Sequence, residues 1–403
     1  MLGDDGPASL RWYSEAGKHI LHGAMNRATS LAPPPRLLMG PGPSNPDPQV
    51  LSAMSAPLVG HLDPYFLQVM DESMGWLRQV YRTQNHHTIP MSGTGTAGLE
   101  TIMLNLLEPG DEAVVGVIGY FGQRLAEIAR RAGANVRTIE ASFGDVIPPE
   151  RFEAELKKKP ARLVALVHAE TSTGACQPVP EVAQLAHRYG ALVAVDCVTS
   201  LGGMPVEVDA WGIDAAGSCS QKCLGAPPGL GPVTFSRKAM DRVRSRGRKT
   251  STWYLDLSLL FEYWGEGGAS RERAFHHTAP VSSIFGFREA LRLILDEGLE
   301  RRWERHQRAH QHLVQGLHRL GLTLFTPPTH QLPMLHVINI PDGVDDLKVR
   351  HALLDRGIEI SGGFGPLKGK TWRVGLMGHN ARTGTVDTFL GALDEVLRGQ
   401  GVQ

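Results

Sequence analysis

The sequence has few cysteines, no net charge and no long apolar run. Only four of its 403 residues are cysteine, too few for a disulfide scaffold, so we expect a reducing compartment and a cytoplasmic protein. The formal net charge is +0, with 41 basic and 41 acidic residues, which gives no electrostatic reason to expect nucleic acid or an anionic membrane as a partner. No apolar run approaches the ~20 residues that span a bilayer, so we predict no membrane partner.

Two cysteines, Cys219 and Cys223, lie four positions apart and raise the question of a zinc site. A structural zinc ion needs four ligands, and no second Cys/His pair at ligand spacing accompanies them. We therefore predict no metal. The basic run from Arg242 to Lys249 is interpreted as solvated surface because no aromatic residues interrupt it. The His86-His87 pair is placed in a loop as polar surface.

Short apolar runs alternate with helical stretches through most of the chain. Leu163–Val167 and Leu192–Val195 are almost entirely apolar, which is typical of parallel strands covered by helices on both faces. Helical stretches such as Phe121–Arg131 lie between such runs. This alternation predicts an α/β fold with a mostly parallel sheet.

The regular alternation of strand and helix patterns ends at about residue 285. Beyond it, long helical patterns and separated strands predict a smaller α+β domain. The length permits two domains with large cores. We expect an N-terminal arm over residues 1–35, a large domain over 36–296 and a small C-terminal domain over 297–403. Translation could also begin at Met25.

Ligands of parallel sheets bind outside the carboxyl ends of the strands. Lys222 follows such an apolar run and lies among small residues in Ser218–Gly229. A confined, partly desolvated ammonium loses its proton readily, so we predict that Lys222 attacks a carbonyl and forms a Schiff base. Asp196 closes the run Leu192–Val195, where a cation such as a protonated pyridine nitrogen would offset the cost of its burial. The alternative role for Asp196 is a helix N-cap.

Upstream of these residues, Ser92–Glu100 opens a helical stretch and contains Thr94, Gly95 and Thr96. Free N–H groups and hydroxyls at a helix N-terminus form an anion site. The glycines also match the dinucleotide pattern G-x-G-x-x-G, but the acidic residue that this pattern needs about 20 positions later is absent. The stretch therefore favours a phosphate cradle over a nicotinamide cofactor, with a tight turn that binds nothing as the alternative.

Two further residues suit a flat cofactor and an acidic substrate. Phe121, at another strand end, could stack on a ring. Arg373 lies inside an apolar strand, where its guanidinium needs a carboxylate, either from a substrate or from a structural Asp or Glu. A Schiff-base lysine, a ring-nitrogen aspartate, a phosphate turn and a carboxylate-binding arginine together describe pyridoxal-5′-phosphate chemistry on an amino acid.

With these features the sequence resembles the class V aminotransferases, pyridoxal-phosphate enzymes of fold type I, and above all the alanine–glyoxylate and serine–pyruvate aminotransferases. The resemblance covers residues from about 36 to 400. It is carried by Met39–Ser44, Ser92–Glu100, Phe121–Arg124, His168–Gly174, Val195-Asp196, Ser200–Gly203, Gly217–Gly229, His276–Thr278 and Arg373–Leu376.

The resemblance implies a homodimer whose active sites lie at the subunit boundary, with small amino acids and 2-oxo acids as substrates. It implies that Lys222 holds the cofactor as an internal aldimine and moves the proton, that Asp196 pairs with the ring nitrogen, and that Thr171 lies near the ring hydroxyl. The residues implied to hold the phosphate are Thr94, Gly95, Thr96, Gln221 and, reaching across from the other chain, Thr278. The residues implied to bind the substrate are Arg373, Gly42 and Ser200.

We therefore predict ping-pong transfer of an amino group from alanine or serine to glyoxylate or pyruvate. Phe121 stands where the family often has tryptophan, and Phe275 where it often has tyrosine, so a phosphate-directed hydroxyl is missing. The alternative is a ureidoglycine–glyoxylate aminotransferase, but those enzymes tend to carry Gln and Asn at the positions of His61 and Phe275. A cysteine desulfurase needs a nucleophilic cysteine in its C-terminal part, whereas all four cysteines precede residue 224.

Overall fold

The computed structural model describes residues 31–265 and 273–401. Contacts divide the chain between Pro35 and Arg36. In the first unit only residues 31–35 are described, and they are exposed and form no helix or strand. Most of the predicted arm, and with it the choice between Met1 and Met25, lies outside the described residues. The division at residues 296 and 297 stays a prediction. The described helices and strands all belong to the second unit.

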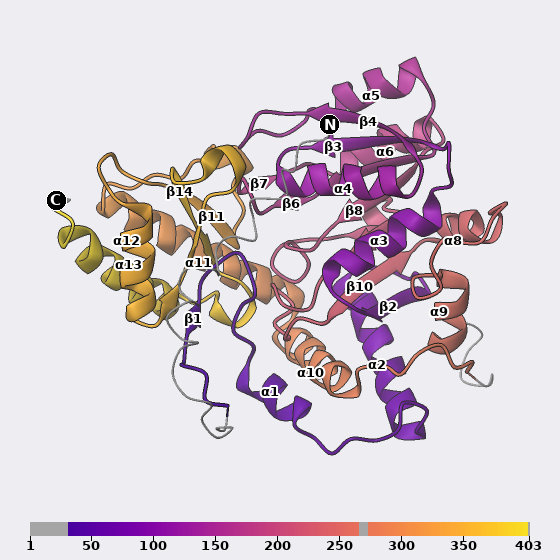
Figure 1. The fold of residues 1–403 in the computed structure, drawn as a ribbon, viewed down its shortest axis with the longest axis horizontal. Coiled ribbons are helices and arrows are strands. Elements are labelled where there is room, and N and C mark those ends of the chain that lie inside the picture. The colour runs from indigo at the N-terminus through magenta and orange to yellow at the C-terminus, as the bar shows by residue number, and fades with distance from the viewer. Residues whose placement is uncertain (1–30, 266–272, 402–403) are drawn as a thin grey trace, which may run out of the picture. The chain divides into compact units, whose positions relative to one another are not determined.

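A seven-stranded sheet in the order β2-β10-β9-β8-β5-β3-β4 forms the centre of this unit (Figure 1). All neighbouring pairs from β9 to β4 are parallel, and β10 runs antiparallel to both of its neighbours. The predicted α/β fold with a mostly parallel sheet is confirmed. The strands are β2 (His87–Ser92), β3 (Glu112–Val117), β4 (Asn135–Glu140), β5 (Leu163–Val167), β8 (Leu192–Asp196), β9 (Ala215–Gly217) and β10 (Leu230–Phe235).

Helices cover both faces of the sheet. Gly116 of β3 lies against α5 (Pro149–Lys158), since a Cβ at Gly116 would lie 2.7 Å from the ring of Phe152. The next residue, Val117, points to the opposite face, where Gly122 of α4 (Tyr120–Arg131) packs on its backbone. Because both faces are covered, every residue of β5 is buried, which explains the continuous apolar runs in the sequence.

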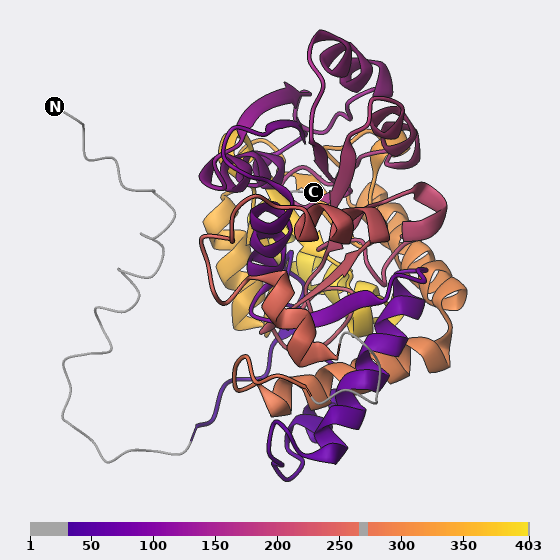
Figure 2. The ribbon, with the colours of Figure 1, turned by 90° about the vertical axis from the view of Figure 1, so that its right-hand side faces the viewer.

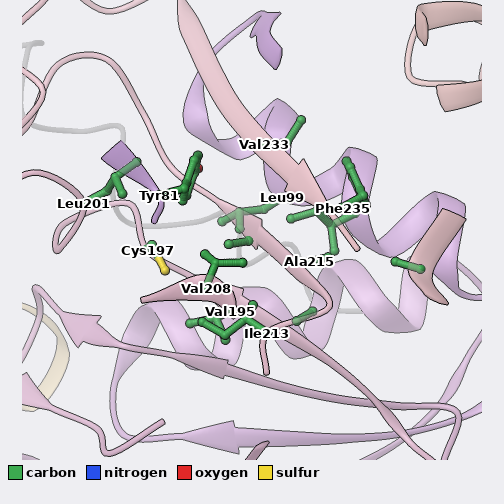
Figure 3. Close-up of a cluster of buried hydrophobic side chains, with 14 of the residues drawn as sticks. Tyr81, Leu99, Val195, Cys197, Leu201, Val208, Ile213, Ala215, Val233 and Phe235 are labelled. Carbon is green, nitrogen blue, oxygen red and sulfur yellow. The ribbon is translucent and has the colours of Figure 1, made fainter. Parts of the chain in front are cut away.

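Buried apolar side chains pack around β8, β9 and β10 and hold the ends of these strands in place. Figure 3 shows Val195 of β8 and Phe235 of β10 among the side chains of this cluster, with Leu99 of α3 (Gly95–Leu106) beside them. Tyr81 is fully buried here, and its hydroxyl donates to the carbonyl of Pro232 at 2.9 Å. A buried phenol with a satisfied hydroxyl adds apolar area without an unpaired polar group.

The C-terminal part has its own small sheet and core. Its antiparallel sheet has the order β11-β14-β13, and Trp372 and Phe389 are fully buried in the core beneath it. A separate two-stranded sheet in this part is formed by β1 (Leu37–Leu38), which comes early in the chain, and β12 (Ile358–Glu359), which pairs with it in parallel. The other elements are α11 (Leu299–Arg319), β11 (Leu335–Asn339), α12 (Asp346–Asp355), β13 (Ser361–Gly362), β14 (Thr371–Gly375) and α13 (Thr383–Arg398).

Two helices from the first part of the chain pack against one helix from much later in it. α10 (Val281–Glu297) lies beside α1 (Pro48–Met54) and α2 (Pro64–Val80) (Figures 1 and 2). None of the helices in the described ranges is long and apolar enough to cross a membrane. The remaining elements are β6 (Ala169–Glu170), β7 (Ala175–Cys176), α6 (Pro180–Arg188), α7 (Val208–Trp211), α8 (Arg237–Arg244), α9 (Leu257–Trp264) and the 3₁₀ turns η2 (Pro328–His330), η3 (Gly365–Leu367) and η4 (Gly378–Asn380).

Two predictions about surface residues were partly wrong. His86 is exposed and lies outside the strand, as predicted, but His87 is the first residue of β2 and does not belong to a loop. The basic run 242–249 is not simply solvated, because Arg246 donates to the carbonyls of Asn105 and Leu107, and Arg242 is paired with two carboxylates just after α3. The last carbonyls of a helix lack intrahelical partners, and these two arginines satisfy and neutralise that end.

Candidate active site at the carboxyl ends of the strands

Lys222 lies in the loop between β9 and β10 and is 8% exposed. Burial lowers its pKa, while the nearby carboxylate of Asp196 acts in the opposite direction. The Nζ atom donates to Thr199 Oγ1 at 3.3 Å. Gly42 packs on the stem of the lysine, since a Cβ there would lie 3.1 Å from Lys222 Cε. The lysine is thus confined and desolvated, a setting that favours its neutral, nucleophilic form.

Asp196 is the last residue of β8 and is 3% exposed. Burial raises its pKa, and the cations of Arg124 and Lys222 lower it. Its Oδ1 accepts from the N–H of Val198 at 2.8 Å, and no helix follows before α7, so the alternative role of helix N-cap reduces to a single turn contact. In the described chain no other group hydrogen-bonds this carboxylate, which leaves Oδ2 without a partner.

The N-terminus of α3 meets the lysine loop directly. A Cβ at Gly95 would lie 2.7 Å from Cys219 Cβ, so only glycine permits this approach. Thr94 is the N-cap residue, but its side chain makes no capping hydrogen bond. Thr96 Oγ1 accepts from Arg124 Nη1 at 3.3 Å. The open N–H groups of the first turn and the free hydroxyl of Thr94 form a helix terminus suited to an anion.

The other residues predicted to bind the cofactor or substrate differ in burial and in their contacts with Lys222. Gln221 precedes Lys222, and its Oε1 is buried with no hydrogen-bond partner. Thr171 is buried in the turn after β6. Ser200 is buried after β8, but its neighbour Thr199 is the residue that contacts the lysine. Thr278 is exposed, so the structure does not bring it to Lys222 of its own chain.

Arg373 lies in β14, is 8% exposed, and has its Nε bonded to the carbonyl of Gly362 at 2.9 Å. Burial lowers its pKa to about 10, and the charge of Glu170 opposes this shift. In the described part of the chain no carboxylate comes within ion-pairing distance of it, and its two Nη groups have no partner. The fork of Arg373 is therefore charged at neutral pH and open to a carboxylate.

Phe121 lies in the first turn of α4, with its ring beside two cations. The guanidinium carbon of Arg124 is 4.7 Å from the ring centroid, and Lys222 Nζ is 6.0 Å from it. A ring in this position can stack on a flat group held between Lys222 and Asp196. The Nε of Arg124 is buried with no partner, a feature that the sequence did not indicate.

Glu170 is a site residue to which the sequence alone assigned no role. Its side chain is fully buried at the end of β6. Oε2 accepts from the N–H groups of Phe121 and Gly122, both at 3.1 Å, and Oε1 accepts from the N–H and Oγ of Ser172 at 3.0 and 2.6 Å. Glu170 thus caps the N-terminus of α4 from another strand end and fixes Phe121. The available signal was an acid only three residues past the apolar strand Leu163–Val167.

The cysteines beside the lysine are free. Burial raises the pKa of Cys219 to about 11 and that of Cys223 to about 12, so both are neutral thiols that pack as small apolar groups. In the described ranges no group of three or more His, Cys, Asp or Glu residues is placed to hold a metal ion.

Comparison with known proteins decides the family. The family model described as aminotransferase class-V matches residues 38–381. The chain belongs to the class-V aminotransferase family. This confirms the resemblance found in the sequence, and it implies pyridoxal phosphate as the cofactor.

Relatives of this class-V aminotransferase carry two different names. The (S)-ureidoglycine–glyoxylate transaminase of Bacillus subtilis is 39% identical over 392 residues, which is 93% of this chain and 93% of that protein. The alanine–glyoxylate aminotransferase of Rattus norvegicus is 41% identical over 397 residues, or 98% and 95% of the two chains. The crystal structure of an alanine–glyoxylate aminotransferase from Nostoc sp. matches with a TM-score of 0.90 and 49% identity, covering 93% of this chain and 98% of that one.

The residues of this class-V aminotransferase fit the cofactor that the family implies. Asp196 has an oxygen without a partner for a protonated ring nitrogen. The Gln221 side chain is buried at its Oε1 atom, which has no hydrogen-bond partner, and its NH₂ group is the part that could donate to a phosphate, because the oxygens of an ionised phosphate accept. The backbone approach at Gly95 is too close for any side chain. Asp196 thus offers a carboxylate oxygen that no group in the described chain pairs, and the protonated ring nitrogen of a bound cofactor would pair it.

Proposed function

We propose that this class-V aminotransferase transfers an amino group from alanine or serine to glyoxylate, or to pyruvate, by ping-pong chemistry. One observation carries the proposal: the charges of both Asp196 and Arg373 act on the buried Lys222, and no carboxylate of residues 31–265 or 273–401 pairs with the guanidinium of Arg373. Such a site combines a lysine that can become neutral, a carboxylate for a pyridinium nitrogen and a cation for a substrate carboxylate.

Pyridoxal phosphate supplies an electron sink for negative charge at the carbon that bears the amino group. Lys222 would attach the cofactor and, once released as a neutral amine, accept the proton from the substrate Cα and pass it on. Asp196 would keep the ring nitrogen protonated. The residues that we propose hold the cofactor are Lys222, Asp196, Thr94, Gly95, Thr96, Phe121, Thr171, Gln221 and the Thr278 of the other chain.

Arg373 would bind the carboxylate shared by amino acid and oxo acid, with Gly42 and Ser200 lining the site. Gly42 packs on the stem of Lys222. The relative named alanine–glyoxylate aminotransferase supports a small donor such as alanine. Because donor and acceptor carry the same carboxylate, one arginine can serve both halves of the reaction.

The choice of donor depends on two residues that contact each other. The rings of His61 and Phe275 lie 5.4 Å apart at 58°, so the two positions at which ureidoglycine enzymes tend to have amides form one surface. Phe275 cannot hydrogen-bond a ureido group, which supports alanine or serine as the donor. Ureidoglycine is the second candidate donor, because the relative from Bacillus subtilis is a ureidoglycine–glyoxylate transaminase.

A panel of donors and acceptors on the purified enzyme tests the proposal. Values of kcat/KM for alanine, serine and ureidoglycine with glyoxylate, and for alanine with pyruvate, give the order directly, with Lys222→Ala as the inactive control. We expect alanine or serine to be preferred. A preference for ureidoglycine of tenfold or more, about 1.4 kcal/mol in transition-state free energy, would reverse the assignment. The double variant His61→Gln/Phe275→Asn should shift preference toward ureidoglycine.

We further propose a homodimer with shared sites. Trp253 is 67% and Phe275 is 61% exposed, and Trp253 stacks on His276 with ring centroids 6.0 Å apart. Exposed aromatic side chains gathered near Thr278 support a second copy covering this face. Light scattering should give twice the mass of the chain, and Phe275→Asp should weaken the dimer.

The four free thiols support a reducing, cytoplasmic location.

A further inference from the structure

Phe364 connects the arginine of the small sheet with the aromatic residues at the start of α4. Its ring centroid lies 5.1 Å from the guanidinium carbon of Arg373. On its other side it lies 4.3 Å from the ring of Tyr120 and 6.3 Å from the ring of Phe121. The half-buried Phe364 is therefore held between two walls of the site, one from each core.

The loop that carries Phe364 is held in one conformation by glycines. A Cβ at Gly363 would lie 2.1 Å from the carbonyl oxygen of Leu367, and Gly365 has φ +52°. The N–H of Gly363 donates to the carbonyl of Thr371 at 2.7 Å, and the N–H of Leu367 donates to the carbonyl of Phe364 at 3.0 Å. A side chain at Gly363 would break this turn, so the turn fixes where the ring lies.

The same loop contacts Arg373 twice. The carbonyl of Gly362 accepts from Nε, and the ring of Phe364 lies over the guanidinium. One contact fixes the edge of the planar group and the other fixes its face. The two Nη groups have no hydrogen-bond partner in the described chain, and these two contacts restrict how the guanidinium can turn, so it is pre-organised for a bidentate carboxylate.

We propose that Phe364 is a positioning residue for the substrate carboxylate. It acts through Arg373: the aromatic face holds the guanidinium plane, and the contact with Tyr120 holds the ring. The inference rests on the proposed function, because it takes Arg373 as the carboxylate site. It goes further in requiring that donor, acceptor and any small carboxylate depend on Phe364 alike, since all three would meet the same fork.

The test compares Phe364→Ala and Phe364→Tyr with a matched control, Phe325→Ala, which removes another half-buried loop phenylalanine that packs against Gly144. Isothermal titration calorimetry of the holoenzyme with propionate, an unreactive carboxylate, measures binding without turnover. Steady-state kinetics give KM and kcat for alanine and glyoxylate. Thermal melting and cofactor content check that each variant is folded and loaded.

A cation–π contact of this kind contributes about fivefold to thirtyfold in affinity. Phe364→Ala should therefore raise the Kd of propionate and both KM values by about that factor, with kcat within about twofold of wild type. Phe364→Tyr, which keeps the ring face, should stay within about threefold of wild type. In an Arg373→Gln background, Phe364→Ala should change the propionate Kd no further, because the two residues act as one unit.

An unchanged propionate Kd in Phe364→Ala would overturn the inference. So would a faster reaction with bulkier donors at an unchanged Kd, since the ring would then be a wall that limits substrate size. Failure of the proposed function looks different. Wild type would then transaminate none of the donors, while propionate binding would still report on Phe364.

Discussion

The carboxylate of Glu170 offers the sharpest test of how this site is built. Three of the four groups that contact it are backbone N–H groups, which can only donate, and the fourth is the hydroxyl of Ser172. Both oxygens therefore have to accept. In Glu170→Gln one oxygen becomes an NH₂ group, which must face at least one N–H donor. The variant has the same shape as wild type, so the change isolates this reversal of hydrogen-bond polarity.

The cost arises from the groups left unpaired. Each buried donor without a partner costs about 1–3 kcal/mol, and one or two donors lose theirs, so we expect Glu170→Gln to lower the free energy of unfolding by about 2–4 kcal/mol. At about 2.1 cal/mol/K of unfolding entropy per residue, a unit spanning residues 36–403 should melt about 3–5 °C lower. Because Phe121 loses its anchor, affinity for pyridoxal phosphate should fall by about tenfold.

Urea unfolding and thermal melting of the apoprotein measure the stability loss, and titration with pyridoxal phosphate measures the loss of affinity. Glu262→Gln is the matched control, since Glu262 is exposed on α9 and should change the melting temperature by less than about 1 °C. If Glu170→Gln behaves like Glu262→Gln, the carboxylate is not the cap of α4 and its assigned role is wrong.

Three other predictions concern charge at and around the site. Lys222→Ala should abolish transamination and prevent the borohydride-trapped attachment of the cofactor, which mass spectrometry detects; an attached cofactor in the variant would point to another lysine. Arg373→Gln should raise the KM for alanine by about 30-fold or more, since a charged hydrogen-bonding partner contributes about 2 kcal/mol or more, while cofactor affinity stays unchanged; a change in cofactor affinity alone would place the arginine elsewhere. Burial lowers the pKa of His168 to about 4 and that of His306 and His336 to about 3, so these side chains stay neutral in the folded state while the unfolded chain takes up protons. Stability is thus present above pH 6.5 and should be lost as the pH falls toward 4, by up to about 1.4 kcal/mol per pH unit for each histidine; denaturant unfolding at pH 7 and pH 5 measures it, and equal stabilities at the two values would refute it.

The sequence predicted the parts of the fold that depend on local pattern. Leu163–Val167 is a strand with the predicted bounds, because a strand buried on both faces must be apolar throughout. Its neighbour extends one residue further than the run Leu192–Val195, to include Asp196, since ladder pairing does not depend on side-chain polarity.

The contacts that join distant residues were outside the reach of pattern reasoning. Lys222 and Asp196 were identifiable because each follows an apolar run. The contact between Thr199 and Lys222, the cap that Glu170 provides for α4 and the position of Phe364 over Arg373 each depend on where two loops meet. A single sequence does not determine which loops come into contact. Polar residues at strand ends could therefore be named as candidates, but which of them contact each other could not be predicted.

The pairing of β1 with β12 has a consequence for how the enzyme is made. Leu37 is among the first described residues to leave the ribosome, and its partner Ile358 is among the last. At synthesis rates of roughly 5–20 residues per second, the first strand waits on the order of half a minute for its partner. Gly42, which packs on Lys222, comes soon after β1 in the chain and waits with it. The parallel sheet can form during translation, but the lysine gains its final neighbour only when synthesis is almost complete, so nascent chains should not yet be competent enzymes.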